Sequence, residues 1–185
     1  MILWLDNALF HLINGRWICS WMDGLAVAFD HPWWLWVPLA ALVLWLAVKG
    51  DHRTRVFLAA ALAAVILTDL LCAQVLKPLI ARVRPCVALE GVRLLVGKKT
   101  SWSMPSNHAA NLTAVAVIVG FHARRWLWLA IPVAFLTAYT RVYVGVHYPL
   151  DVLVGAAVGA TVAVFVWAAA QALDRRWSAR QSAAK

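Results

Sequence analysis

The chain has 185 residues, of which 64% are hydrophobic; its mean hydropathy is +0.76 and its formal net charge is +9 at pH 7. A composition this apolar excludes an ordinary soluble domain and indicates several membrane spans within a single domain. The basic residues lie between apolar segments and form no single stripe. This distribution argues against nucleic acid as a partner and favours anionic lipid headgroups or phosphates.

Two short amphipathic segments are predicted at the start of the chain. Residues 1–13 place apolar side chains around Asp6, and residues 18–29 show a similar pattern that Asp23 interrupts. Both segments are too polar to span a bilayer, so we expect them to lie in the membrane interface. The first dozen residues lack a basic n-region, which argues against a cleaved signal peptide.

About five transmembrane helices are predicted after a break at Asp30, His31 and Pro32. They are expected at residues 33–48, 56–76, 106–121, 126–143 and 150–173. The predicted fold class is therefore all-α, a polytopic membrane helical bundle preceded by N-terminal amphipathic helices. We expect one integral membrane domain, residues 1–185, made of an interfacial segment (1–32), a transmembrane core (33–173) and a basic cytoplasmic tail (174–185).

The basic residues predict the orientation of this bundle. If the five spans alternate, one face carries Lys49, Arg53, Arg55, Arg124, Arg125, Arg175, Arg176, Arg180 and Lys185. The other face carries Lys77, Arg82, Arg84, Arg93, Lys98, Lys99, Arg141 and Arg16. The first group sits in short loops and the tail, where the positive-inside bias is strongest. We therefore place it in the cytoplasm, which puts the opposite face in the periplasm or another extracytoplasmic space outside an inner membrane.

Tryptophan and cysteine carry little functional information. Most of the 12 tryptophans lie near predicted span ends, as in the aromatic belt of membrane proteins. Cys19, Cys72 and Cys86 form an odd set without close spacing, which indicates neither a zinc site nor a disulfide framework. A pairing of Cys19 with Cys86 stays open.

Three ionisable residues stand at the mouth of the fifth span: Arg141, His147 and Asp151. Such groups beside hydrocarbon cost several kcal/mol each unless they are paired or hydrated. Pro149 suits the first turn of a helix, which would place Asp151 near the positive end of the helix dipole and four residues after His147. A histidine oriented by a carboxylate is a prepared nucleophile or base. The alternative is a capping aspartate beside an interfacial histidine.

Two further segments return to the same membrane face. Lys77 and Arg84 are seven residues apart, almost two helical turns, so both cations are expected on one side of a helix. A basic cap on the second span is the alternative. Ser106 and Asn107 open the third span, where small polar residues suit an N-cap and the free N–H groups suit a phosphate. His108 follows in the first turn; an interfacial histidine is the alternative there.

Together these segments match the needs of phosphoryl transfer. Cations hold the equatorial oxygens, one histidine attacks in line and another group protonates the leaving oxygen. Asp51 and Glu90 are isolated, and no clustered carboxylates are available for magnesium. We therefore expect no metal and no cofactor, and a mechanism through phosphohistidine instead of two-metal chemistry.

The three segments resemble the signature motifs of the type 2 phosphatidic acid phosphatase (PAP2) superfamily, membrane lipid phosphatases related to acid phosphatases and vanadium haloperoxidases. The first motif, Lys-x6-Arg-Pro, is matched in full by Lys77, Arg84 and Pro85. The second, Pro-Ser-Gly-His, is matched at Pro105, Ser106 and His108, with Asn107 for glycine. The third, Ser-Arg-x5-His-x3-Asp, is matched at Arg141, His147 and Asp151, with Thr140 for serine.

The resemblance implies a role for each matched residue. His147 would be the nucleophile, Asp151 would orient it, and His108 would protonate the leaving oxygen and then activate water. The implied phosphate-binding residues are Lys77, Arg84, Ser106 and Arg141. Asn107 would either supply a side-chain donor to the phosphate or narrow the pocket, because the family glycine lets the backbone approach the phosphate closely.

The resemblance also implies a substrate class. We expect a membrane hydrolase that removes a terminal phosphate from a lipid phosphate or diphosphate, as in the short bacterial undecaprenyl diphosphate phosphatases. Phosphatidylglycerophosphate, phosphatidate and lipid A phosphates are alternative substrates. Vanadate-dependent halide oxidation and non-catalytic binding of a lipid phosphate are alternatives of other classes. The expected partners are the bilayer and its lipid phosphates.

Overall fold

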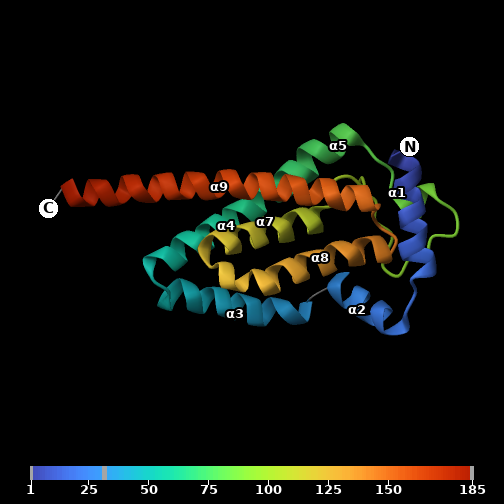
Figure 1. Ribbon diagram of the computed structural model, residues 1–185, viewed down its shortest axis with the longest axis horizontal. Coiled ribbons are helices and arrows are strands. Elements are labelled where there is room, and N and C mark those ends of the chain that lie inside the picture. Colours follow the sequence, from blue (N-terminus) through green and yellow to red (C-terminus); the bar gives the residue numbers. More distant parts are fainter. Residues whose placement is uncertain (1, 31–32, 184–185) are drawn as a thin grey trace.

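The computed structural model describes residues 2–30 and 33–183, and these residues form helices and loops without a strand (Figure 1). The helices in chain order are α1 (Ile2–His11), η1 (Leu12–Arg16), α2 (Ser20–Asp30), α3 (Trp33–Lys49), α4 (His52–Leu70), η2 (Leu71–Leu76), α5 (Lys77–Ile80), α6 (Pro85–Ala88), α7 (Asn107–His122), η3 (Arg124–Trp126), α8 (Leu127–Tyr143) and α9 (Pro149–Ala183). The all-α prediction is confirmed. The expected break at His31 and Pro32 lies outside the described residues, as do the last two residues of the predicted tail.

The long helices run alongside one another, and α1 lies across one end of the bundle (Figure 1). Two helical stretches, His52–Ala88 and Pro149–Ser182, are long and apolar enough to cross a membrane, and Val37–Lys49 is a shorter apolar helix. The last helix, α9, extends about ten residues past the predicted end of the fifth span, so the basic tail continues the helix through residue 183.

The connection after the second predicted span differs from the expectation. The helix widens into the π turn η2 before residue 76, and it does not stop there but continues as α5 through Ile80. Pro78 has no N–H to donate to the preceding turn, and a π turn accommodates that loss. Ala81 then adopts a left-handed conformation (φ 48°) and ends the helix. The prediction that Lys77 and Arg84 share one helix is therefore wrong, because Arg84 follows this turn in extended backbone.

Two glycines bring α9 into backbone contact with α7. A Cβ atom added at Gly159 would lie 2.0 Å from the carbonyl oxygen of Ala110, and one at Gly155 would lie 2.5 Å from that of Ser106. Small residues four apart on one helix face allow such an approach between membrane helices. The contact seats the start of α7 on the first turn of α9, where the Ser106 N–H donates to the Asp151 carbonyl oxygen at 3.0 Å.

The N-terminal helices are tied to this same end of the bundle by polar side chains. The Asn14 amide donates to the carbonyl oxygens of Arg93 and Tyr143, both at 2.8 Å. Asp23 accepts hydrogen bonds from Arg93 and from the Tyr143 hydroxyl. These residues hold the loop after α6 and the end of α8 in place. They sit where Gly145, at φ 86°, turns the chain toward α9.

Candidate active site

His147 lies in the turn between α8 and α9, and it faces Asp151 as expected. The helix α9 begins at Pro149, so Asp151 occupies its first turn. The Nδ1 atom of His147 lies 3.4 Å from Oδ2 of Asp151, and both side chains are buried. The same carboxylate oxygen accepts the Tyr148 N–H at 2.9 Å and the hydroxyl of Ser103. A carboxylate held by this many donors has a fixed orientation, and so does the imidazole beside it.

The other oxygen of this carboxylate is held by Arg82, a residue for which no role was predicted. Its Nη1 lies 2.7 Å from Oδ1 of Asp151, and its Nη2 lies 2.5 Å from Oδ2 of Asp6 in α1. The guanidinium also covers the ring of Tyr148 at 3.9 Å. Arg82 thus joins the first helix to the last. In the sequence, only its position between Lys77 and Arg84 in the first motif indicated that Arg82 lies near the site.

Arg84 approaches His147 from the side opposite the carboxylate. Its Nη1 lies 3.1 Å from Nε2 of His147 and donates to the Val146 carbonyl oxygen at 2.8 Å. Its Nε and Nη2 donate to the carbonyl and hydroxyl oxygens of Ser101 at 2.7 and 3.0 Å. The structure therefore brings the first and third motifs together, although through a turn and not along one helix.

The surroundings of His147 favour the neutral imidazole. Burial is the largest influence and lowers its pKa to about 4, the Arg84 cation acts in the same direction, and the hydrogen bond to Asp151 opposes both. A neutral ring that donates its Nδ1 proton to the carboxylate has a lone pair on Nε2. That nitrogen faces Arg84 and is the ring atom with a lone pair available for attack.

Ser106 and Arg141 are among the described residues that have a buried polar atom without a hydrogen-bond partner. Ser106 occupies the N-cap of α7, yet within the described part of the chain its hydroxyl makes no capping bond and its Oγ has no partner. Nε of Arg141 also has no partner among the residues that the structure describes, while Nη1 of the same residue lies 2.5 Å from Oδ1 of Asp30. Buried polar groups are normally satisfied, so an unpaired donor and an unpaired hydroxyl indicate room for an acceptor such as a phosphate oxygen.

His108 and Lys77 complete the predicted set. His108 is exposed at the second position of α7, and it lies within electrostatic range of Arg141 and Lys77. Lys77 is buried at the first position of α5, and its charge also acts on His147. The described residues show no hydrogen bond between the two histidines. The charge of Lys77 acts on both histidines. Lysine binds a phosphoryl group as a point charge.

Asn107 and Thr140 replace motif residues, and their side chains bond within the protein. Nδ2 of Asn107 donates to Oδ1 of Asp69 at 2.8 Å. The Thr140 hydroxyl donates to the Thr137 carbonyl oxygen at 2.8 Å within α8. Cys19, Cys72 and Cys86 are free thiols. The described part of the chain has no group of three His, Cys, Asp or Glu side chains placed to hold a metal ion.

The chain is similar in sequence to known phosphatases. The family model described as PAP2 superfamily matches residues 56–175. The chain is 34% identical over 157 residues to an undecaprenyl-diphosphatase of Sulfolobus acidocaldarius, covering 83% of this chain and 73% of that protein. It is also 34% identical over 164 residues to a lipid A 4'-phosphatase of Bacteroides thetaiotaomicron, covering 84% and 72%.

Two solved structures have the same fold. The crystal structure of Aquifex aeolicus LpxE superposes with a TM-score of 0.64 at 28% identity, covering 88% of this chain and 94% of that one. The transmembrane PAP2 type phosphatidylglycerolphosphate phosphatase of Bacillus subtilis superposes with a TM-score of 0.67 at 23% identity, covering 95% and 87%. On the family match and these identities, the chain belongs to the PAP2 superfamily of membrane phosphatases.

Proposed function

We propose that this phosphatase removes the terminal phosphate of a membrane lipid diphosphate or phosphate through a phosphohistidine formed on His147. The observation that carries the proposal is the arrangement around that ring. Asp151 holds Nδ1, and Arg84 faces Nε2 at 3.1 Å. Among the described residues, Ser106 in the second motif and Arg141 in the third each have a buried polar atom without a hydrogen-bond partner.

The proposed reaction has two steps. Nε2 of His147 attacks phosphorus, the bond from phosphorus to the leaving oxygen breaks, and His108 gives its proton to that oxygen. His108 then takes a proton from water, the water oxygen attacks phosphorus, and the N–P bond breaks to release inorganic phosphate. Lys77, Arg84, Ser106 and Arg141 hold the non-bridging oxygens, whose charge they stabilise in both transition states. Asp151 stabilises the positive ring that forms when Nε2 bonds to phosphorus.

The similar proteins support the substrate class. Undecaprenyl diphosphate is the substrate that we propose first, because an undecaprenyl-diphosphatase is among the relatives with 34% identity. A lipid A phosphate, phosphatidylglycerophosphate or phosphatidate is the alternative, supported by the lipid A 4'-phosphatase relative and by the fold shared with the phosphatidylglycerolphosphate phosphatase.

We also propose five spans: α3, the continuous helix from α4 through α5, α7, α8 and α9. The helices α3, α7 and α8 have 16 or 17 residues, about 25 Å at 1.5 Å per residue. That length is slightly shorter than a hydrocarbon core of about 30 Å, and local thinning of the bilayer accommodates such a mismatch. The helices α1 and α2 would lie in the interface. The single domain 1–185 keeps the proposed divisions at residues 32 and 173.

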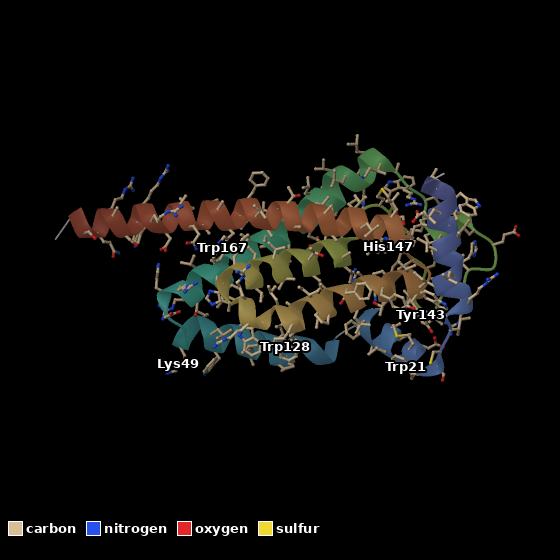
Figure 2. All side chains as sticks on the ribbon, in the orientation of Figure 1. Trp21, Lys49, Trp128, Tyr143, His147 and Trp167 are labelled. Atoms are coloured by element: carbon tan, nitrogen blue, oxygen red, sulfur yellow. The ribbon has the colours of Figure 1, made fainter. Side chains whose placement is uncertain are left out.

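The proposed orientation puts the active site on the periplasmic side of an inner membrane. His147 lies at the end of the bundle that carries α1 and α2, and Lys49 lies at the opposite end (Figure 2). That opposite end also carries Arg53, which approaches the His122 carbonyl oxygen at the end of α7. The gathering of cations there fits the positive-inside rule.

One experiment tests the activity and the nucleophile together. Purified protein in detergent is given a panel of lipid phosphates and diphosphates with excess chelator, and phosphate release is measured. We expect release from at least one lipid diphosphate, and a phosphorylated protein that is labile in acid and stable in base when radiolabelled substrate is quenched. Both signals should disappear in a folded His147→Ala variant; full activity in that variant refutes the nucleophile. Lipid-phosphate binding without turnover in the wild type refutes the enzymatic proposal.

A further inference from the structure

A half-buried carboxylate near the end of α4 binds two asparagines of α7. Oδ1 of Asp69, in α4, accepts from Nδ2 of Asn107 at 2.8 Å and from Nδ2 of Asn111 at 3.2 Å. The two asparagines are four residues apart and so lie on the same face of α7. An acidic side chain within an apolar helix is costly in a membrane and is retained for a specific partner or task. The proposed chemistry gives Asp69 no part in either step.

Asn107 stands where the second PAP2 motif has glycine, beside both Ser106 and His108. A side chain at this position is close to the free N–H groups at the start of α7, which the phosphate needs. In the structure this side chain turns toward α4, and its Nδ2 is used by Asp69. Its Oδ1 is buried and has no hydrogen-bond partner within residues 2–30 and 33–183, so the bond to Asp69 is the polar contact that fixes the amide there.

From this geometry we infer that Asp69 is a positioning residue that holds the Asn107 side chain against α4 and thereby keeps the phosphate-binding end of α7 open. Asn107 departs from the motif, and Asp69 compensates for that departure. Asn111, one turn further along α7, donates a second and longer hydrogen bond to the same carboxylate. This inference rests on the proposed function, because the held side chain matters only if a phosphate binds beside Ser106.

A purely electrostatic role of Asp69 must be distinguished from the positioning of Asn107 by experiment. Asp69 also lies within electrostatic range of Lys77, so its charge alone supports a cation of the site. Asp69→Asn distinguishes the two effects, because an amide oxygen still accepts from Asn107 while the charge is lost. If orientation of Asn107 is the role, Asp69→Asn stays within about threefold of the wild type and Asp69→Ala does not.

The decisive test is a double-mutant cycle between Asp69 and Asn107. We expect Asp69→Ala to lower kcat/KM about tenfold or more, since small misplacements at a reacting centre are costly. We expect Asn107→Gly to remain close to the wild type, and the double variant Asp69→Ala/Asn107→Gly to recover most of the activity. Rescue by removing a second side chain is not expected if Asp69 only stabilises the fold. Thermal stability is measured alongside and should not recover with the activity.

The affinity for inorganic phosphate, measured on the same four proteins, provides a readout that does not depend on turnover. We expect the phosphate affinity to follow the same order as the activity. It should be weakened in Asp69→Ala and restored in the double variant. Asn111→Ala is the matched control, since it removes the other asparagine and leaves the Asn107 contact in place. The inference is overturned if the double variant stays as weak as Asp69→Ala, or if Asp69→Ala behaves as wild type. It is also overturned if Asp69→Asn loses as much as Asp69→Ala. Phosphate binding that follows the expected order in a protein without turnover leaves the inference standing and removes the proposed function.

Discussion

Nη1 of Arg141 lies 2.5 Å from Oδ1 of Asp30, and both side chains are 1% exposed. Arg141 is in the last turn of α8, and Asp30 is the final residue of α2. Lys99 approaches the same carboxylate at 3.5 Å. An arginine proposed to bind phosphate is thus fixed by a carboxylate from the N-terminal helices, and no described residue pairs with its Nε. The N-terminal segment therefore contributes directly to the geometry of the site.

Asp30→Ala should weaken both the fold and the site. It leaves a buried guanidinium without its carboxylate, a change that costs about 3–5 kcal/mol in buried pairs. We expect a lower unfolding temperature in detergent and a higher KM for the lipid substrate. Asp30→Asn, which keeps a hydrogen-bond acceptor, should be milder in both assays. An Asp30→Ala protein with wild-type stability and KM would show that Arg141 does not need this partner.

Arg82→Gln should lower kcat without removing substrate binding. The substitution releases Asp151 from one of its donors and breaks the contact with Asp6, so His147 loses its fixed orientation. A loss of about tenfold to a hundredfold in kcat is expected. Arg175→Gln, an exposed arginine near the far end of α9, is the control and should leave kcat unchanged. Equal effects in the two variants would contradict a role for Arg82.

The acid limb of the pH profile should lie well below the usual histidine range. Because burial lowers the pKa of His147 to about 4, the ring loses its proton near that pH and is neutral, with a free lone pair, at every higher pH. Formation of phosphohistidine in the quench assay should therefore persist to pH 5. A limb centred near pH 6.5 would show that the ring is as easily protonated as in water.

The same lowered pKa predicts the direction of a stability change. Between pH 4 and 6.5 the unfolded histidine binds a proton that the folded one does not. The contribution of His147 to the free energy of unfolding therefore rises with pH through this window. The wild type should lose more stability than a folded His147→Gln protein when the pH is lowered from 6.5 to 4. Equal losses in thermal unfolding experiments would contradict the assignment.

Gly159→Leu should prevent α9 from seating on α7. Even the Cβ atom would lie 2.0 Å from a backbone oxygen of Ala110, so the helices must separate. We expect loss of thermal stability together with loss of activity. Gly24→Ala in α2 is the matched control, because nothing lies within 4 Å of the added Cβ. That change should be neutral or stabilising by about 0.5–1 kcal/mol.

The sequence determined most of the long helices and the pairing of His147 with Asp151. The apolar pattern located α3, α7 and α8 to within about a residue, because polar residues interrupt the chain at both ends of each long apolar run. Pro149 and the spacing of His147 and Asp151 were sufficient to predict a histidine held by a carboxylate. These are local features, set by neighbours along one short stretch of chain.

The tertiary structure decided how the other groups are partnered. Arg82 bonds to Asp6 and Asp151, which are separated from it by 76 and 69 residues. Asp30 reaches Arg141 across 111 residues, and Asp69 reaches Asn107 across 38. Such pairs leave no periodic or spacing signal, because each depends on which helix faces pack together. The left-handed turn at Ala81 could not be predicted from the sequence for a related reason. Alanine disfavours that conformation, so its surroundings in the fold must hold it there.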